Sequence, residues 1–368
     1  MRSTTGFLSR LAALLLAGLL TACGSGGQEE ALAAANAPAG SELAELYEKA
    51  RAAGESTVVV YSSTVDTEFE PLWLEFQKDF PGIRVIYMMV TSAQMVPRMA
   101  AERVTGSHMV DLLLQTVDVL PELKKNGDLE PWRPASAASL AEGFSDADDH
   151  YHYVLSKLYG LAYNTRRVKP EELPREFDDL NDEQWRGAFT FVQPLGPVQN
   201  TDTALATLLR EQAITVEQME NLRDNGSYAM PEAGVSYVAQ GRQKLNLWSY
   251  LPPLVRQQEL GAPIDIRFVP DFSIRVPYGL AIARNAPHPA AARLLKAWLF
   301  TPRGQQALAE HSHMLGTMPD APAPALFAAA GKARLLYTTS EPAELLRELQ
   351  ATRSTLAEVF LKPKRVGH

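Results

Sequence analysis

Short β-branched runs alternate with helical stripes in the first third of the sequence. The runs "STVVVYSS", "IRVIYMMV" and "VDLLLQT" have the length and composition of buried strands. After the first run, apolar side chains recur with the spacing of one helix face at Phe69, Leu72, Trp73, Phe76 and Phe80. Strands that alternate with helices pair in parallel and are covered by those helices, so this alternation predicts an α/β fold.

The pattern changes around "YGLAYNTRRV" and then resumes. The runs "AFTFVQP", "LNLWSYLPP", "IDIRFVP" and "VPYGLAIA" are typical of strands, and "TALATLLREQ", "AAARLLKAWLF" and "TPRGQQALAEHS" are typical of helices. A chain of 368 residues has room for about two domains of roughly 150 residues each. We therefore expect two α/β lobes.

The only cysteine of the chain, Cys23, follows its most apolar stretch. Residues 1–22 contain Arg2, Arg10 and the apolar run 11–20, which predicts a secretory signal peptide. The run is shorter than the roughly 20 residues that span a bilayer. "LTAC" resembles the bacterial lipobox, in which the cysteine is acylated and becomes the new N-terminus. An ordinary signal with a coincidental cysteine is the alternative.

The residues after Cys23 and the overall composition restrict the other properties of the chain. Residues 23–40 begin with Gly-Ser-Gly-Gly after the cysteine and predict a flexible tether. A net charge of -8 without clustered Lys and Arg argues against nucleic acid as a partner. A single cysteine excludes an internal disulfide and a Cys-based zinc site.

Two histidine pairs are the candidates for a metal site. His150 with His152, and His311 with His313, would each share a face in a strand. We expect all four to be solvated, because we identify no carboxylate at ligand spacing beside either pair. Enzyme activity is not expected either, since the sequence has no G-x-S-x-G, no H-E-x-x-H and no cysteine left to react.

Several stretches resemble a known family. They are "ELYEKARAAGESTVVVYSS", "LYGLAYNT", "LPREFDDLNDEQWRGAFTFVQP" and "APHPAAARLLKAWLFTPRGQQALAE". Together they resemble the extracellular solute-binding proteins of ATP-binding-cassette (ABC) importers, within the cluster that includes ferric-ion, phosphonate, thiamine and polyamine binders. The resemblance runs from about Ser41 to Ser312.

The resemblance implies a type II periplasmic-binding-protein fold, with two parallel-sheet lobes joined by two crossover strands. It places lobe I at 41–160, lobe II at 161–272, a return to lobe I at 273–340 and a C-terminal helix packing on the lobes at 341–368. It also implies a small-molecule solute in the cleft between the lobes, no cofactor, and an ABC permease and ATPase as partners. We expect a monomer outside the cytoplasm, held on a membrane by the lipid at Cys23.

Ligands of open parallel sheets bind beyond the carboxyl ends of the strands. In this chain those ends carry small polar side chains that suit an anionic or polar ligand: Ser62, Ser63, Thr91, Ser92 and Thr116 in the first lobe, and Gln193, Thr201 and Thr203 in the second. A helix cap without ligand contact is the alternative for each hydroxyl.

Aromatic and charged side chains complete the candidate set. Tyr163, Trp248 and Tyr250 lie where the resemblance places aromatics that line the cleft, although each could belong to the core. Asp271 and Arg275 flank the segment that enters the second crossover, where they could meet a charged ligand or lie in solvent.

The ligand expected from these residues is a small organic carboxylate or phosphate-bearing anion, held by hydroxyls, backbone N–H groups and Arg275. Ferric-ion binders of the family ligate iron with two adjacent tyrosines. Here the matching stretch has Ser249 beside Tyr250, so iron, with Tyr250 as a ligand, is the alternative. Thiamine or a polyamine is a further alternative, with Trp248 to stack on the ligand and Asp271 to pair with its positive charge. A sensor partner without a transport role is a further alternative.

Overall fold

The computed structural model describes residues 40–196, 200–269, 272–330 and 342–363. Its helices are α2 (Glu42–Ala52), α3 (Glu70–Asp79), α4 (Ser92–Thr105), α5 (Val119–Lys125), α6 (Asn200–Arg210), α7 (Val216–Asn225), α8 (Pro231–Ala239), α9 (Leu251–Glu259), α10 (Pro289–Leu299), α11 (Pro302–His311), α12 (Ala325–Ala330) and α13 (Pro342–Phe360). Its strands are β1 (Thr57–Ser62), β2 (Arg84–Met89), β3 (Leu112–Thr116), β4 (Leu129–Glu130), β5 (Tyr151–Asn164), β6 (Phe189–Phe191), β7 (Ser227–Tyr228), β8 (Leu245–Tyr250), β9 (Ile264–Arg267), β10 (Ile274–Ala283) and β11 (Leu315–Gly316).

The strands form one mixed sheet in the order β2-β1-β3-β10-β5-β8-β6-β7. The parallel pairs predicted from the sequence lie toward its two ends, where β1 pairs with β2 and β3, and β6 pairs with β7 and β8. Between them, β10 and β5 run antiparallel to each other and to their neighbours β3 and β8. The sheet is therefore parallel at both ends and antiparallel in the middle.

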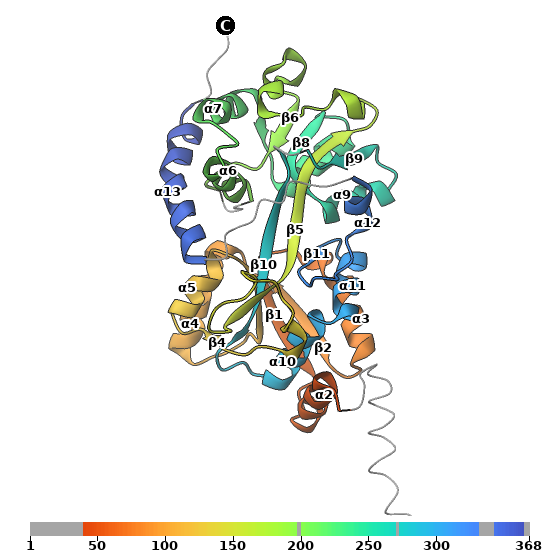
Figure 1. Ribbon diagram of the computed structural model, residues 1–368, viewed down its shortest axis with the longest axis vertical. Helices are drawn as coiled ribbons and strands as arrows, with labels where there is room; N and C mark the ends of the chain where they lie inside the picture. The colour runs from red at the N-terminus through yellow and green to blue at the C-terminus, as the bar shows by residue number, and fades with distance from the viewer. Residues whose placement is uncertain (1–39, 197–199, 270–271, 331–341, 364–368) are drawn as a thin grey trace, which may run out of the picture.

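The molecule has two halves, joined by the two long strands β5 and β10 (Figure 1). The lower half of Figure 1 contains β1–β4 with α2–α5, α10 and α11, and the upper half contains β6–β9 with α6–α9. Every residue of β5 is buried, because both halves cover it. These two strands match the two crossover strands expected from the sequence.

The core follows the alternation of side chains along the strands. In the lower half, Val60, Leu114 and Leu280 belong to a hydrophobic cluster on one face of the sheet. Their chain neighbours Tyr61, Leu113 and Ala281 belong to a second cluster. Because successive side chains of a strand point to opposite faces, these two clusters lie on the two sides of the sheet.

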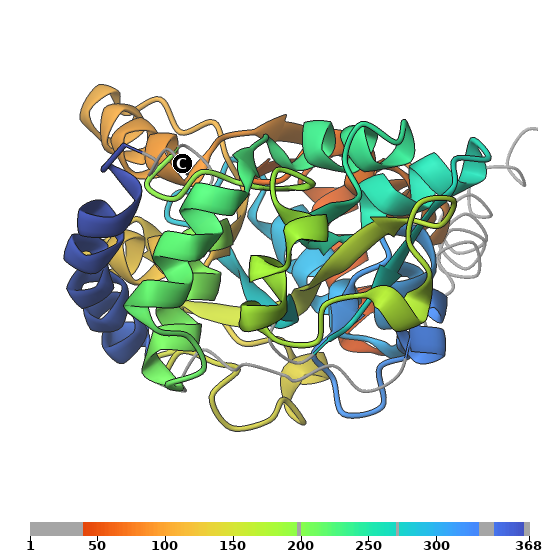
Figure 2. The same cartoon turned by 90° about the horizontal axis from the view of Figure 1, so that it is seen from above.

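The chain returns to the upper half near its C-terminus. In α12, the Phe327 ring lies 5.4 Å from the ring of Phe268, just beyond β9. Helix α13 packs on α6 and α7 (Figure 2). There the Phe360 ring lies 6.2 Å from that of Phe191, and Arg223 Nη1 donates to the Val359 carbonyl at 2.8 Å.

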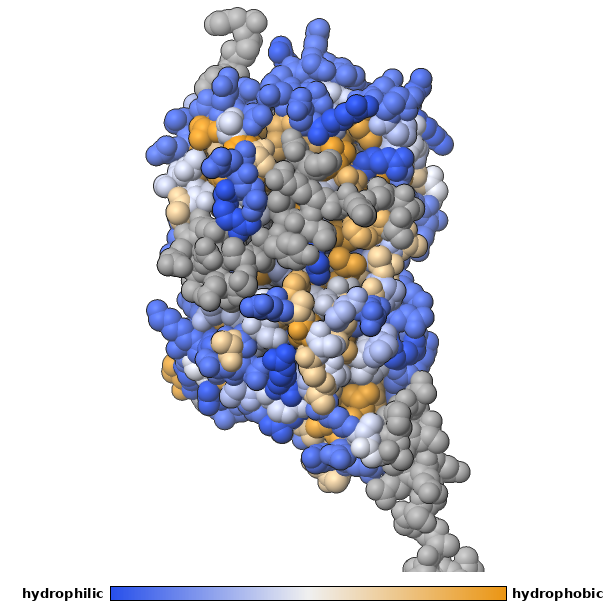
Figure 3. Space-filling model, in the orientation of Figure 1, coloured by the Kyte–Doolittle hydropathy of each residue, from blue (hydrophilic) through white to orange (hydrophobic). Residues whose placement is uncertain are grey.

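Hydrophilic residues cover the outer ends of both halves on the face shown in Figure 3, and apolar residues gather toward the middle. Among the residues that the structure describes, no helix is long and apolar enough to cross a membrane. The predicted signal peptide, Cys23, the tether up to residue 39 and Asp271 lie outside the described residues.

Candidate functional site

A polar stripe crosses the junction of the two halves on the face of the sheet that carries the larger hydrophobic cluster. Thr116 pairs with Tyr278, and Val276, two residues before Tyr278, pairs with Lys157. Tyr159, two residues after Lys157, pairs with Tyr250. The alternation of side chains therefore predicts that Lys157 shares a face with Tyr278 and Tyr250. The contacts agree, since Lys157 Nζ lies 5.2 Å from the Tyr278 ring centroid and 4.6 Å from that of Tyr250.

Two carboxylates complete this stripe. Glu68, from the short 3₁₀ helix η1 (Asp66–Glu68) after β1, accepts a hydrogen bond from the Tyr250 hydroxyl on Oε1 at 2.7 Å. Its Oε2 lies 3.2 Å from Lys157 Nζ. An oxygen of Glu232, in the first turn of α8, lies 3.0 Å from the same hydroxyl, so the two carboxylates share its single proton.

We call these residues the junction cluster: Glu68, Lys157, Tyr159, Glu232, Tyr250 and Tyr278. Glu68 comes from the lower half and Tyr250 and Glu232 from the upper half, while the other three lie on the strands that join the halves. Glu68, Lys157 and Tyr250 are 2%, 4% and 4% exposed, whereas Glu232 is exposed. The cluster is therefore buried except on the side of α8.

Local features of β8 and α8 position Tyr250 and Glu232. The register of β8 against β5 shifts between Gly160 and Ala162, and Trp248 opposite this bulge has a φ of +50°. A non-glycine residue in that region is strained, and such bulges re-aim the side chains beside them. A Cβ on Gly234 of α8 would meet the side-chain amide of Asn246 on β8. The absence of a side chain at Gly234 therefore lets α8 lie close to β8.

Burial and charge keep Tyr250, Tyr159 and Lys157 of the junction cluster protonated. Burial, together with the negative charges of Glu68 and Glu232, raises the pKa of the Tyr250 phenol well above its ordinary value. Burial and the neighbouring Tyr278 raise that of Tyr159 in the same way. For Lys157, burial acts to lower the pKa of the ammonium, but Glu68, Tyr278 and Glu232 together outweigh it and the pKa is raised. Tyr250 is thus a neutral donor, and Lys157 is a buried cation.

A second contact joins the halves beside the junction cluster. Arg256, in α9 of the upper half, donates from Nη1 to the Thr67 hydroxyl in η1 of the lower half at 2.8 Å. Glu68, the next residue, accepts from Tyr250, the residue directly before α9. The segment after β1 is therefore held against the start of α9 by two hydrogen bonds, and the halves are closed on each other there.

Comparison with known proteins identifies the family to which this chain belongs. Residues 107–337, more than half of the chain, match the model of the family described as bacterial extracellular solute-binding protein. The chain belongs to this family. A comparison with curated proteins gives no match.

Solved structures of solute-binding proteins share the fold. Iron-bound HitA from Pseudomonas aeruginosa has a TM-score of 0.68 at 20% identity, over 82% of this chain and 99% of that one. The ferric binding protein from Campylobacter jejuni has a TM-score of 0.67 at 15% identity, over 82% and 99%. AfuA from Actinobacillus pleuropneumoniae, with fructose-6-phosphate bound, has a TM-score of 0.67 at 18% identity, over 83% and 99%. These likenesses confirm the predicted periplasmic-binding-protein fold.

The hydroxyls predicted at the strand ends of this solute-binding protein lie at the junction or cap helices. Ser62 is buried at the end of β1, where its Oγ accepts from the Thr64 N–H at 3.3 Å. The Ser63 Oγ is buried without a hydrogen-bond partner among the described residues. Thr91 caps α4, and the Ser92 hydroxyl lies 3.3 Å from that of Thr116.

The strand-end residues of the upper half are divided between surface and core. Gln193 is exposed after β6. Thr201, in the first turn of α6, is buried, and its Oγ1 makes no hydrogen bond in the described part of the chain. Thr203 lies one turn before Thr207 in α6, and its carbonyl accepts from the Thr207 hydroxyl at 2.7 Å.

Of the other predicted residues, Tyr250 lies in the junction cluster, and two aromatics pack in the upper half instead. Trp248 lies among core rings, 6.3 Å from Phe177 and 6.4 Å from Phe191. The Tyr163 hydroxyl donates to Asp265 at 3.0 Å, and burial raises the pKa of Tyr163 to about 12.

Arg275 lies on β10, two residues from Pro277 and on a crossover strand as expected. Its Nε donates to the Ser156 hydroxyl at 2.8 Å, and its guanidinium lies over the Phe144 ring at 5.2 Å. These contacts tie Arg275 to β5 and to the segment before it, on which Phe144 lies. The cation in the junction cluster is Lys157.

Sequence reasoning missed five residues of the junction cluster: Glu68, Lys157, Tyr159, Glu232 and Tyr278. Lys157 left a signal, because it is the one Lys, Arg, Asp or Glu in the 14 residues of β5. A lysine in an otherwise apolar strand needs a buried partner. Glu68 lies only six residues after Ser62, on the loop that the strand-end rule already selected.

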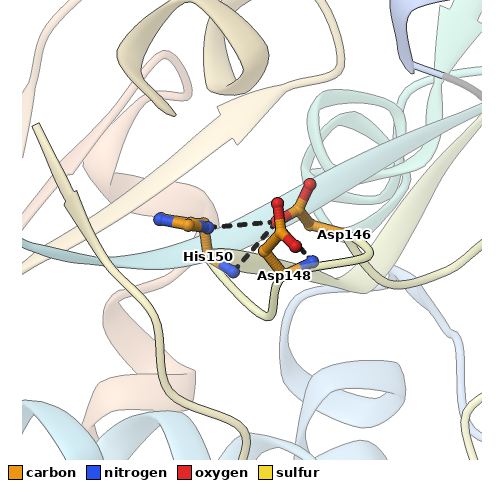
Figure 4. A group of neighbouring side chains, drawn as sticks. All are labelled: Asp146, Asp148 and His150. Carbon is orange, nitrogen blue, oxygen red and sulfur yellow. Dashed lines mark hydrogen bonds and ion pairs between the residues drawn. The ribbon is translucent and has the colours of Figure 1, made fainter. Parts of the chain in front are cut away.

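The expectation for the first histidine pair was wrong. His152 is fully buried in β5, not solvated, and its Nε2 lies 3.2 Å from Asp149. His150 does have carboxylates at ligand spacing, since its Nδ1 lies 3.2 Å from Asp146 and the two group with Asp148 within 4.8 Å (Figure 4).

This acidic cluster of Asp146, Asp148 and His150 already holds a cation of the protein. Lys124 Nζ donates to both Asp146 oxygens, at 2.8 and 2.9 Å, and to Asp148 at 2.8 Å. The Asp146 carboxylate also accepts from the backbone N–H groups of Asp148 and His150. With its oxygens occupied in this way, the acidic cluster is a structural ion pair that ties α5 to the segment before β5.

Proposed function

We propose that this solute-binding protein serves an ABC importer, and that its two halves close on a small solute at the junction cluster. The observation that carries the proposal is the Tyr250–Glu68 hydrogen bond, which joins the upper half to the lower half beside a buried lysine. A solute bound there would contact both halves and both connecting strands. Its differential affinity for the closed arrangement would then shift the population of the two states.

The solute in this proposal carries an acid group, carboxylate or phosphate, for which Lys157 is the buried cation. Three strand-end hydroxyls belong to the lower half: Ser62 ends β1, Ser63 directly follows it and Thr116 ends β3. A charge-assisted bond from an ammonium to an acid group is worth about twice a neutral hydrogen bond. The lobes are proposed at the predicted bounds, except that α12 (Ala325–Ala330), predicted within the return to lobe I, packs on the upper half. The protein is proposed to act as a monomer.

The experiment that tests the site is a thermal-shift screen of organic acids and phosphate esters. The purified wild-type protein and Tyr250→Phe are compared with the control Tyr237→Phe, which removes a phenol hydroxyl from α8. We expect at least one solute to raise the Tm of the wild type and of Tyr237→Phe, and to have a clearly smaller effect on Tyr250→Phe. A solute that stabilises all three proteins equally would place the binding site elsewhere.

Ferric iron is the second candidate, because Glu68, Glu232 and Tyr250 present hard oxygen donors at one point. HitA and the Campylobacter jejuni protein, which share the fold, are described as iron-bound and ferric binding. Titration with ferric citrate tests it. A saturable phenolate-to-iron absorption band that disappears in Tyr250→Phe would support iron, and a folded protein without the band would exclude tyrosinate-ligated iron.

We also propose that lipid on Cys23 holds the protein on the outer side of a membrane, as two or more acyl chains do stably. The support is the sequence of residues 1–23. Fractionation of cells that express the wild type and Cys23→Ser tests this proposal. The wild type is expected in the membrane fraction and Cys23→Ser in the soluble fraction. Equal membrane association of the two would contradict the anchor.

A further inference from the structure

Lys157 and Glu68 form a buried ion pair, in which Glu68 Oε2 has no hydrogen-bond partner among the described residues. One Glu68 oxygen accepts from Tyr250 and the other faces Lys157. The Lys157 ammonium lies between that carboxylate and the faces of two tyrosine rings, Tyr250 and Tyr278. A solute that inserts between the two charged groups must therefore separate partners that the protein itself supplies.

The charge of the solute decides what this displacement costs. An anion that binds Lys157 and separates it from Glu68 leaves a buried carboxylate without its counter-charge. A cation that binds Glu68 leaves the Lys157 ammonium in the same position. Removal of one partner from a buried ion pair is strongly destabilising, because the other charge stays buried and uncompensated. A solute with a single charge therefore meets a penalty at this site.

A solute with both charges avoids this penalty. Its acid group can pair with Lys157 while its ammonium pairs with Glu68, so that each buried charge exchanges one partner for another. The faces of Tyr250 and Tyr278, which now carry the Lys157 ammonium, suit any alkylammonium. We propose that the solute is a small zwitterion, with an ammonium and a carboxylate or phosphate in one molecule.

Unpartnered polar groups beside Glu68 support the acid end of this solute. The hydroxyls of Ser63 and Thr64 are buried and have no hydrogen-bond partner among the described residues, and Thr64 is 3% exposed. Both lie in the segment between β1 and η1, and η1 carries Glu68. Buried polar groups are rarely left unsatisfied, so these hydroxyls indicate a missing hydrogen-bond partner, and an acid group could accept from both. Glu232 is exposed and bonded to Tyr250, so solvent reaches the junction cluster from the side of α8.

The inference rests on the proposed function, and its test uses matched probes with the full mature chain. The zwitterions are glycine, 3-aminopropanoate, 4-aminobutanoate and phosphoethanolamine. The analogues with one charge, meaning charge of a single sign, are acetate, propanoate, butanoate, ethyl phosphate, ethylammonium and propylammonium. Thermal shift ranks the probes and isothermal calorimetry measures their affinities. We expect at least one zwitterion to bind at least about tenfold more tightly than each of its own analogues with one charge.

Variants assign the two charges of the zwitterion to their partners. Glu68→Gln is expected to weaken its binding roughly tenfold or more, and Lys157→Met likewise. Glu211→Gln and Lys78→Met remove the same charges from the surface and are expected to leave the affinity unchanged. The comparison of probes on the wild type requires no variant, so it stands even if Lys157→Met fails to fold.

Two results would contradict the proposal of a zwitterionic solute. One is an analogue with one charge that binds as tightly as its zwitterion, and the other is a panel in which no member binds. These results are distinguishable from failure of the proposed function. If ferric citrate or a larger phosphate ester binds and Tyr250→Phe abolishes that binding, the junction cluster is the site and only the zwitterion is wrong. If binding of every solute is independent of Tyr250, both proposals are wrong.

Discussion

The junction cluster and the acidic cluster contain the same charges, two carboxylates and one lysine, but they differ in placement. In the acidic cluster, Lys124 of α5 bonds both carboxylates directly, and the lysine and the carboxylates all belong to the lower half. In the junction cluster, Lys157 pairs with Glu68 only, and a tyrosine hydroxyl bridges the two carboxylates. The first arrangement holds one half together, whereas the second joins two halves that can separate.

Loss of the lysine should distinguish the two clusters most clearly. Lys157→Met leaves Glu68 buried without its counter-charge, and we expect it to lower the free energy of unfolding by about 3–5 kcal/mol. Lys124→Met removes a partly exposed ammonium from carboxylates that keep backbone hydrogen bonds, and we expect a loss of about 1 kcal/mol. Urea unfolding measures both. Equal losses would remove the distinction between a buried and a solvated cluster.

Acid should destabilise the protein through His152, which is buried in the core next to the acidic cluster. Burial, with the positive charge of Lys296, lowers the pKa of His152 from 6.5 to about 4. Because the unfolded chain binds the proton more readily, stability is lost as the pH falls from 6.5 through 4, by about 3 kcal/mol. His152→Gln should remove most of this loss. An unchanged pH profile in His152→Gln would assign the acid sensitivity to another group.

Lys296 is a buried lysine near His152, and its pKa is shifted in the opposite direction to that of Lys157. Lys296 donates to the Trp132 carbonyl, and burial lowers its pKa to about 7. The folded pKa is below that of the unfolded chain, so stability rises as the pH increases from about 7 toward 10.5. Lys296→Met should therefore raise the free energy of unfolding near pH 7, by about 1–3 kcal/mol. A loss of stability at pH 7 would show that the ammonium has a stabilising partner.

The smallest effect is expected from metal ions. The Lys124 ammonium already bonds Asp146 and Asp148. Binding of Mn²⁺ or Zn²⁺ at the acidic cluster should therefore not occur, and neither ion should raise the Tm of the wild type. Thermal shift with and without each ion measures this. A saturable increase in Tm that disappears in His150→Gln would contradict the assignment as a structural ion pair.

The sequence was sufficient for the α/β architecture because its strands and helices have strong local patterns. The runs before Ser62 and Thr116 predicted β1 and β3, and the polar side chains that end them lie at the junction as strand ends of a parallel sheet should. The full length of β5 was not visible, because burial by both halves gives it no alternation and Lys157 interrupts its apolar character.

The junction cluster could be predicted only in part, since its residues meet through tertiary contacts. Glu68 and Tyr250 are 182 positions apart, and no local pattern links them. Trp248 was a fair candidate by position, but the bulge in β8 sends its ring into the core of the upper half and leaves Tyr250 at the junction. The sequence therefore located the strand ends better than it identified which side chains face each other.

The most direct test of the account is the distance between the halves when the Tyr250–Glu68 bond is removed. Spin labels at Val104 and Leu260, both highly exposed and one in each half, report that distance in a Cys23→Ser background. We predict a short distance for the wild type and a broader, longer distribution for Tyr250→Phe, with Tyr237→Phe unchanged. An identical distribution in the wild type and Tyr250→Phe would contradict the claim that the junction cluster closes the two halves.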